Sequence, residues 1–192
     1  MNDPLFLLVG PSGSGKTTVA EELESRYNYK SVWSYTTRPK RHVGEKYHTF
    51  ISDAEFDNLT NMVAYTVYNS YKYCTTKEQL DAADVYVVDI SGVETLLQNY
   101  KTDRPIVIFY FDSTVTTRIN RMLDRHDNDT AIVGRLHNDE AFDWYSKLDH
   151  IVWHYANIEY KNVELYKIDA NKNKKEVLEM VLYYMERFEE GC

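Results

Sequence analysis

Residues 5–27, LFLLVGPSGSGKTTVAEELESRY, set the architecture of this chain. The first five are uniformly apolar, which is typical of a strand buried on both faces of a parallel sheet. A glycine-rich turn follows them. Beyond the turn, apolar side chains recur on one helix face at Val19, Leu23 and Tyr27, with glutamates on the other face. The stretch therefore predicts a buried strand, a loop and a helix in immediate succession.

The turn itself, residues 10–17, reads GPSGSGKT and matches the pattern G-x-x-x-x-G-K-[ST]. Its glycines permit close approach of the backbone, so successive N–H groups can surround a phosphate at the amino end of the helix. Lys16 adds positive charge for the β- and γ-phosphates, and the Thr17 hydroxyl is placed to ligate Mg²⁺. The expected nucleotide-binding residues are Gly10, Ser12, Gly13, Ser14, Gly15, Lys16, Thr17 and Thr18. The pattern alone does not separate a kinase from a GTPase or an ATPase motor.

A second magnesium partner is expected after another buried strand, since Mg²⁺ needs further oxygen ligands near the phosphates. Asp89 has that position, directly after the apolar run Val85–Val88. Aspartate at this point is also typical of a helix N-cap, and this alternative stays open.

Apolar runs predict further strands at Val85–Val88, Ile106–Phe111, Ile151–Trp153 and Leu165–Ile168, and helical patterns lie between them. Such alternation predicts an α/β fold with three layers, in which helices cover both faces of a central parallel sheet. The last segment, residues 174–190, predicts a helix that packs on this sheet. Residues 34–82 interrupt the alternation and contain β-prone runs such as Met62–Tyr68, so we expect a small inserted subdomain of mixed β structure.

Composition narrows the class of protein. The chain has 192 residues, of which 43% are hydrophobic and 27% charged, as is typical of a single globular domain. Its net charge of −8 argues against nucleic acid as a partner, because binding a long polyanion needs a basic surface. The amino-terminal apolar run is too short for a signal peptide or a membrane span, so we expect a cytoplasmic protein that binds no membrane.

Two local clusters of basic residues stand out against this acidic background, and each suggests a site for a small anion. Arg38 and Arg41 are three residues apart after a turn, and their guanidiniums can grip a monophosphate with bidentate hydrogen bonds. A solvated pair of loop arginines is the alternative. The second cluster contains Arg118, Arg121 and Arg125, whose spacing puts them on one side of a helix. A basic solvent-exposed face, paired with the aspartates at 124 and 127, is the alternative there.

The segment from Ser34 to Glu45, SYTTRPKRHVGE, resembles the guanylate kinase signature S-x-T-T-R-x-x-R-x-G-E, with one extra residue before Gly44. Three further blocks follow in the order of that family. They are YCT at residues 73–75, like its Y-G-T; DISG at 89–92, like its D-x-x-G; and the arginines from 121 to 135, like its R-L-x-x-R and R-L. The resemblance covers nearly the whole chain and implies a nucleoside monophosphate kinase with a core (1–33, 83–117 and 137–192), an acceptor-binding insertion (34–82) and a helical lid (118–136).

By this resemblance, Arg38, Arg41 and Tyr73 bind the acceptor phosphate, and Ser34 and Thr75 reach the base. The family has another phosphate-binding tyrosine near Phe50, and here Tyr47 or His48 stands in its place. The expected acceptor-binding residues are Ser34, Arg38, Arg41, Tyr47, His48, Tyr73, Thr75 and Asp89.

Three positions depart from the family pattern. Ala64 falls where the family has a glutamate that accepts hydrogen bonds from guanine, and a methyl group cannot accept them. Cys74 replaces a glycine, and His154 falls where the family has an asparagine near a later strand. The base that this chain reads is therefore open.

The resemblance implies transfer of the γ-phosphoryl group of ATP, with Mg²⁺, to GMP or dGMP. Such a transfer depends mainly on positioning and on electrostatic stabilisation of charge. We expect Lys16, Arg121, Arg125 and Arg135 to stabilise the transferred group as catalytic residues. Two alternatives remain: a kinase of the same fold acting on another nucleotide or a sugar phosphate, and a non-catalytic module that binds proteins. The chain is expected to be a monomer or a homodimer.

Overall fold

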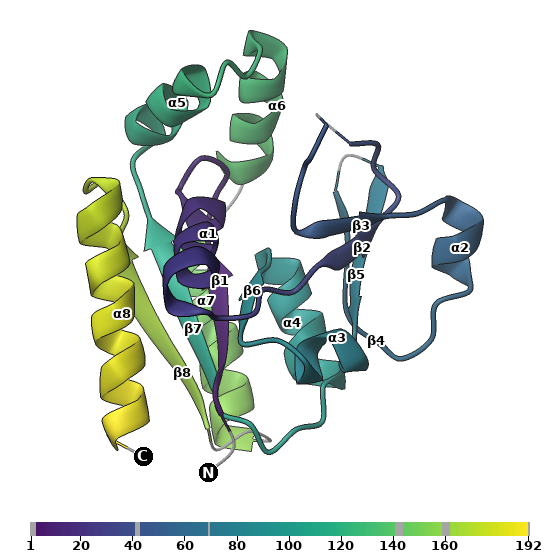
Figure 1. Ribbon diagram of the computed structural model, residues 1–192, viewed down its shortest axis with the longest axis vertical. Helices are drawn as coiled ribbons and strands as arrows, with labels where there is room; N and C mark the ends of the chain where they lie inside the picture. The colour runs from purple at the N-terminus through teal and green to yellow at the C-terminus, as the bar shows by residue number, and fades with distance from the viewer. Residues whose placement is uncertain (1–2, 41–42, 69, 141–143, 159–161, 192) are drawn as a thin grey trace.

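A computed structural model describes residues 3–40, 43–68, 70–140, 144–158 and 162–191 of the chain. Its central sheet is parallel throughout and has the strand order β6-β1-β7-β8. These strands are β1 (Leu5–Val9), β6 (Val85–Val87), β7 (Ile106–Asp112) and β8 (Val163–Asp169). Helices cover both faces of the sheet (Figure 1), so the predicted three-layer α/β fold is confirmed.

The two apolar layers follow from the alternation of side chains along a strand. On β1, Phe6 and Leu8 pack with α1 (Lys16–Tyr27) and α8 (Lys174–Gly191). Leu5, Leu7 and Val9 point the other way and pack with α4 (Ile90–Asn99) and α7 (Trp144–Ile158). All five side chains are at most 1% exposed, and each contributes about 1.5–3 kcal/mol by leaving water. The strand that carries the glycine-rich loop is thus buried on both faces.

One predicted strand is wrong. The run Ile151–Trp153 lies inside α7, and the fourth strand of the sheet is β8. Leu148, Ile151, Val152 and Tyr155 recur at helical spacing and pack on the core, whereas Trp153 is 62% exposed. A helical period over eight residues therefore outweighs a short apolar run. The strand predicted at Leu165–Ile168 and the final helix are both confirmed.

A second, smaller sheet comes from the insertion after β1 and α1. Its order is β3-β2-β5-β4, with β2 and β3 parallel and the other pairs antiparallel. The strands are β2 (Ser34–Thr36), β3 (His48–Phe50), β4 (Met62–Tyr68) and β5 (Tyr71–Thr76), and short helices α2 (Asp53–Asp57) and α3 (Lys77–Asp81) accompany them. The sheet is attached to the core where the Tyr65 amide donates to Thr95 Oγ1 on α4 at 2.9 Å. The predicted mixed β subdomain is confirmed.

Two helices, α5 (Val115–Asp124) and α6 (Asp129–Glu140), lie above the loop between β1 and α1 (Figure 1). They occupy the part of the chain in which the arginine-rich lid is expected. The exact division into core, insertion and lid stays a prediction. Among the described residues, no helix combines the length and the apolar composition that crossing a membrane requires.

Candidate active site

The loop of residues 10–15 has a backbone that requires glycine. Gly13 has φ +79°, and a Cβ there would meet the carbonyl oxygen of Arg118 at 2.9 Å. Gly15 precedes α1 with φ +101°, and no side chain caps the amino end of that helix. The first N–H groups of α1 are therefore not occupied by a capping side chain, as expected for a helix end that binds an anion.

Lys16 lies folded over this loop. Its Nζ donates to the carbonyl oxygens of Gly10 at 2.6 Å and Pro11 at 2.9 Å. Burial lowers the pKa of Lys16 to about 8, against the opposing effect of the carboxylates of Asp139 and Asp89. The ammonium thus sits among oxygen partners that phosphate oxygens can replace.

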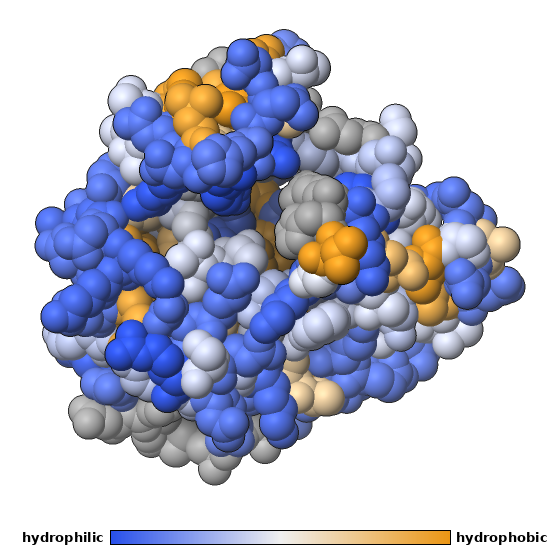
Figure 2. Space-filling model, turned by 45° about the horizontal axis from the view of Figure 1, so that its top comes forward, coloured by the Kyte–Doolittle hydropathy of each residue, from blue (hydrophilic) through white to orange (hydrophobic). Residues whose placement is uncertain are grey.

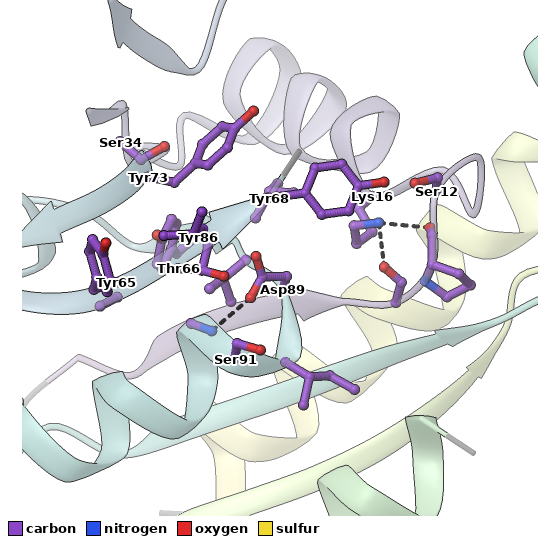
Figure 3. A pocket seen from close by; sticks show the side chains of 18 of the residues that line it. Ser12, Lys16, Ser34, Tyr65, Thr66, Tyr68, Tyr73, Tyr86, Asp89 and Ser91 are labelled. Atoms are coloured by element: carbon purple, nitrogen blue, oxygen red, sulfur yellow. Dashed lines mark hydrogen bonds between the residues drawn. The ribbon is translucent and has the colours of Figure 1, made fainter. Parts of the chain in front are cut away.

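Two cavities meet at Lys16. The first, of about 490 Å³, runs from the loop to the small sheet and is lined by Ser34, His48, Tyr73 and Asp89, among others. Figure 3 shows this cavity, and Figure 2 shows a hollow with a largely hydrophilic rim on the same face of the molecule. The second, of about 500 Å³, is lined by residues 13–19 together with Arg121, Arg125 and Lys174. Two ligands, one in each cavity, can therefore approach each other at Lys16.

The three arginines of α5 have different partners. Arg121 donates from Nη1 to the Ser14 carbonyl oxygen at 3.0 Å and from Nη2 to that of Lys172 at 2.9 Å. Arg118 is 4% exposed and donates to Asp139 Oδ2 at 2.9 Å. Arg125, at the end of the helix, lines the second cavity and pairs with Asp127 at 2.7 Å. Arg118 thus forms a buried ion pair with Asp139, whereas Arg121 and Arg125 face the loop.

Asp127 joins the two parts of the lid. Its Oδ2 accepts from Arg125 Nη2 at 2.7 Å and from Arg135 Nη1 at 2.5 Å. Burial alone would raise the pKa of Asp127, but the two guanidiniums lower it. One alternative for this cluster was a basic exposed face paired with aspartates, and the pairing with Asp127 is present. The same carboxylate also brings Arg125 and Arg135 together.

Beside the first cavity, on the small sheet, charged and hydroxyl groups converge. Arg38 is 7% exposed; its Nε donates to the Tyr73 hydroxyl at 3.1 Å, and its Nη2 pairs with Glu45 Oε1 at 2.6 Å. Ser34 Oγ lies 2.9 Å from His48 Nδ1. A buried guanidinium beside a phenol and an imidazole is a suitable environment for a phosphate group.

The family model described as guanylate kinase matches residues 2–152 of the chain. The chain belongs to the guanylate kinase family. Among curated relatives, a guanylate kinase of Clostridium tetani is 35% identical over 133 residues, which is 63% of this chain and 62% of that protein. A guanylate kinase of Mycoplasma genitalium is 28% identical over 175 residues, 81% of this chain and 70% of the relative. The chain thus spans less than two thirds of the first of these relatives.

A solved guanylate kinase structure from Anaplasma phagocytophilum superposes with a TM-score of 0.54 at 15% identity, covering 96% of this chain and 85% of that one. At this identity the likeness concerns the fold alone. It agrees with the parallel sheet and the smaller mixed sheet described above.

Several residues that the family resemblance singles out lie in or beside the first cavity, and others do not. Arg41 lies outside the described residues. Tyr47 does not face the cavity: its φ is +64°, and its hydroxyl donates to Glu24 Oε2 on α1 at 2.9 Å. Its neighbour His48 does line the cavity, because β3 begins there and turns successive side chains to opposite faces. Thr75 is fully buried and reaches the cavity only through Tyr86, to which it donates at 2.7 Å.

Asp89 caps α4, as the alternative interpretation holds. Its Oδ1 accepts from the Gly92 amide at 2.7 Å (Figure 3). Burial raises the pKa of Asp89, against the opposing effects of hydrogen bonds and of Lys16. The carboxylate also lines the first cavity, so capping and ligand binding are compatible roles.

The site fits a magnesium ion that receives most of its oxygen ligands from a bound nucleotide and from water. The described residues contain no cluster of three His, Cys, Asp or Glu side chains that could hold a metal unaided. Asp89 lines the first cavity and Thr17 lines the second. Lys16 lines both cavities. Two protein oxygens completed by phosphate oxygens and water are the usual environment of Mg²⁺ in such sites.

The strand expected before His154 is absent from the structure at this position. His154 lies within α7, not after a strand. The asparagine that follows the last strand is Asn171, whose Oδ1 accepts from the amide of Thr114 at 2.8 Å and from Thr117 Oγ1 at 3.1 Å. Asn171 thereby fixes the start of α5 next to the loop.

Asp139 and Tyr68 are further site residues without a sequence signal. Asp139 Oδ2 accepts from the backbone N–H of Ser12 at 2.9 Å. Tyr68 lines the same cavity as Lys16 (Figure 3), and its buried hydroxyl has no hydrogen-bond partner in the described part of the chain. Both line the first cavity.

Proposed function

We propose that this chain is an ATP-dependent nucleoside monophosphate kinase that converts GMP or dGMP to the diphosphate. One observation carries the proposal: Lys16 lines both cavities, so a donor bound in one and an acceptor bound in the other meet at its ammonium group. The names of the curated relatives support the same substrates.

The second cavity suits the donor. It contains the uncapped start of α1 and the guanidiniums of Arg121 and Arg125, which are the groups that a triphosphate attracts. When bound, Mg²⁺ supplies neutralisation of charge on the β- and γ-phosphates, and Thr17 and Asp89 are the residues that would hold it.

The first cavity suits the acceptor. We assign the acceptor phosphate to Arg38 and Tyr73, with Arg41 as their expected partner, and the base to the region of Ser34 and Thr75. Arg38 is already desolvated and oriented by Glu45 and Tyr73, so binding requires little further ordering of this side chain. The acceptor phosphate then replaces part of the contact between Arg38 and Glu45.

Transfer needs charge stabilisation more than covalent chemistry. Lys16 exchanges its carbonyl partners for phosphate oxygens, and Arg121 and Arg125 hold the donor phosphates. Arg135 and Arg125 share Asp127, so we assign both guanidiniums to the transferred group. Closure of α5 and α6 excludes water, which otherwise competes as acceptor. A cytoplasmic location agrees with free nucleotides as substrates. We expect the enzyme to act as a monomer or a homodimer.

A coupled assay of ADP release, with ATP and Mg²⁺ against GMP, dGMP and other monophosphates, tests the proposal. We expect turnover with GMP or dGMP and none with Lys16→Met. ATP binding without any turnover would instead favour a non-catalytic binding module, and turnover with sugar phosphates alone would favour another acceptor.

A further inference from the structure

The last residue of β4 places a phenol in the first cavity. Side chains alternate between the two faces of a strand, and Thr66 and Tyr68 lie on the less exposed face of this part of β4. On the other face, Tyr65 and Val67 are 41% and 55% exposed. Figure 3 shows Thr66 and then Tyr68 along the strand, in the direction of Lys16. β4 therefore carries Tyr68 toward the phosphate loop.

Asp89 relates this face of β4 to the loop. Burial raises the pKa of Asp89, and a hydrogen bond from the Thr66 side chain and the charge of Lys16 oppose that effect. Tyr68 is two residues beyond Thr66, which corresponds to about 7 Å along an extended strand. Tyr68 thus lies beyond Asp89 on the side of Lys16, the residue that lines both cavities (Figure 3).

The hydroxyl of Tyr68 is buried and has no hydrogen-bond partner in the described part of the chain. The other buried side-chain atoms without a partner there belong to Ser31, Ser113 and Arg118. These three residues line neither cavity, whereas Tyr68 lines the first. A buried hydroxyl with an unused hydrogen is costly, so its position in a cavity suggests that a ligand accepts that hydrogen.

Two carboxylates line the cavity together with Tyr68, and neither is its partner. Asp89 accepts a hydrogen bond from the Gly92 amide at 2.7 Å. Asp139 accepts one from the Ser12 amide at 2.9 Å. Both carboxylates are thus engaged by backbone amides, and the acceptor for the phenol is expected to arrive with the ligand.

Under the proposed function, phosphate oxygens are the acceptors that a nucleotide brings to Lys16. A phenol differs from an ammonium or a guanidinium because it donates a hydrogen without adding charge. During phosphoryl transfer, charge spreads over the three equatorial oxygens of the moving group, and a preorganised donor near them stabilises the transition state. Tyr68 lies in the acceptor cavity on the side of Lys16, where that group passes from donor to acceptor.

We propose that Tyr68 is a further catalytic residue, whose hydroxyl donates to an equatorial oxygen of the phosphoryl group during transfer. The bond between the γ-phosphorus and the ADP oxygen breaks while a bond to an oxygen of the acceptor phosphate forms, and Tyr68 keeps its hydrogen throughout. This inference rests on the proposed kinase function, and it adds a donor from β4 to those of the phosphate loop and the lid.

The first test compares the steady-state kinetics of the wild type and Tyr68→Phe with ATP, Mg²⁺ and GMP or dGMP. Removing a donor that acts only in the transition state should lower kcat by about 10- to 100-fold. KM for the acceptor and the affinity for ATP should change by no more than about threefold. Tyr71→Phe is the matched control, because Tyr71 pairs with Tyr68 across the hairpin, is 36% exposed and lines neither cavity. It should leave kcat unchanged.

The second test measures the Tm of the same proteins without nucleotide. If the Tyr68 hydroxyl is buried without a partner in the free protein, Tyr68→Phe removes a cost of folding and should raise Tm by about 2–4 °C. Tyr71→Phe should leave Tm unchanged. A variant that is more stable but slower is expected for a group placed for the reaction, since a residue that serves packing alone would not combine the two changes.

The outcomes separate the inference from the function on which it rests. Absence of turnover by the wild type would refute the kinase function and the role of Tyr68 with it. Normal wild-type turnover with an unchanged kcat in Tyr68→Phe would overturn the inference and leave the kinase function intact. A raised acceptor KM at unchanged kcat would show binding of the ground state only, and would also overturn it. A Tyr68→Phe variant that is less stable than the wild type, or unfolded, would show that the hydroxyl has a partner in the free protein, contrary to the inference.

Discussion

The backbone N–H of Ser12 donates to the carboxylate of Asp139 at 2.9 Å, which places a negatively charged side chain from α6 on an amide of the phosphate loop. The same oxygen accepts from Arg118 at 2.9 Å, and this ion pair is nearly buried. Under the proposed function, Asp139 is an internal anion that competes with nucleotide phosphates for this amide of the loop.

We predict that Asp139→Asn strengthens ATP binding by about tenfold, which corresponds to the removal of ~1.4 kcal/mol of charge repulsion. Asparagine keeps an acceptor for Arg118 and removes the negative charge. Isothermal titration of ATP into the variant measures the change, and Asp149→Asn on the exposed side of α7 is the control. Equal or weaker ATP binding by Asp139→Asn would contradict the role of Asp139 as a competing anion.

Lys16 predicts a pH dependence of both stability and ATP binding. Burial lowers its pKa in the folded chain to about 8, from 10.5 when unfolded. Between these values the unfolded chain binds more protons, so the contribution of Lys16 makes the free energy of unfolding rise with pH through this window. ATP binding needs the charged form and should weaken as the pH rises above about 8.

Urea unfolding and ATP titration from pH 7 to pH 10 check both slopes. In Lys16→Met the contribution of this group to each slope is removed. If the wild type and Lys16→Met show the same pH dependence of ATP affinity, another group controls binding.

Arg135→Ala should lower kcat by about 100-fold or more, because a charge that stabilises the transferred group is lost. Its only described anchor is Asp127, which it shares with Arg125, and neither contact reaches the loop that binds the donor. ATP affinity should therefore change by no more than a few-fold. Steady-state kinetics and ATP titration give the two values, and Arg26→Ala, in an exposed ion pair on α1, is the control. Near-normal turnover by Arg135→Ala would remove Arg135 from the catalytic set.

Arg38→Lys should raise KM for the acceptor by about tenfold or more while ATP affinity is unchanged, because lysine keeps the charge but loses the planar, bidentate geometry. The substitution leaves a cation beside the buried Glu45 and so protects the fold better than alanine does. Initial rates over a range of GMP concentrations measure KM, with Arg26→Lys as the matched control. An unchanged KM would show that Arg38 serves only to hold Glu45 and Tyr73.

Some features of this protein can be derived from the order of its residues because their causes are local. The first strand, the loop and the first helix follow from a contiguous apolar run, from glycines at positive φ such as Gly13, and from helical spacing. The phosphate loop follows from these, and most other strands and helices of the core follow from similar local patterns further along the chain.

Other features depend on contacts between distant parts of the chain, and no local pattern contains them. The Ser12–Asp139 contact joins residues 127 positions apart and exists because α6 packs above the loop. Which of the two apolar runs, 151–153 or 165–168, joins the sheet is settled by packing, because residues 148–155 pack on the sheet as part of a helix and β8 pairs with β7. The apposition of Ala64, Thr75 and Tyr86 requires two sheets to meet. Packing energy, summed over many weak contacts from remote segments, selects these arrangements, and sequence spacing does not encode them directly.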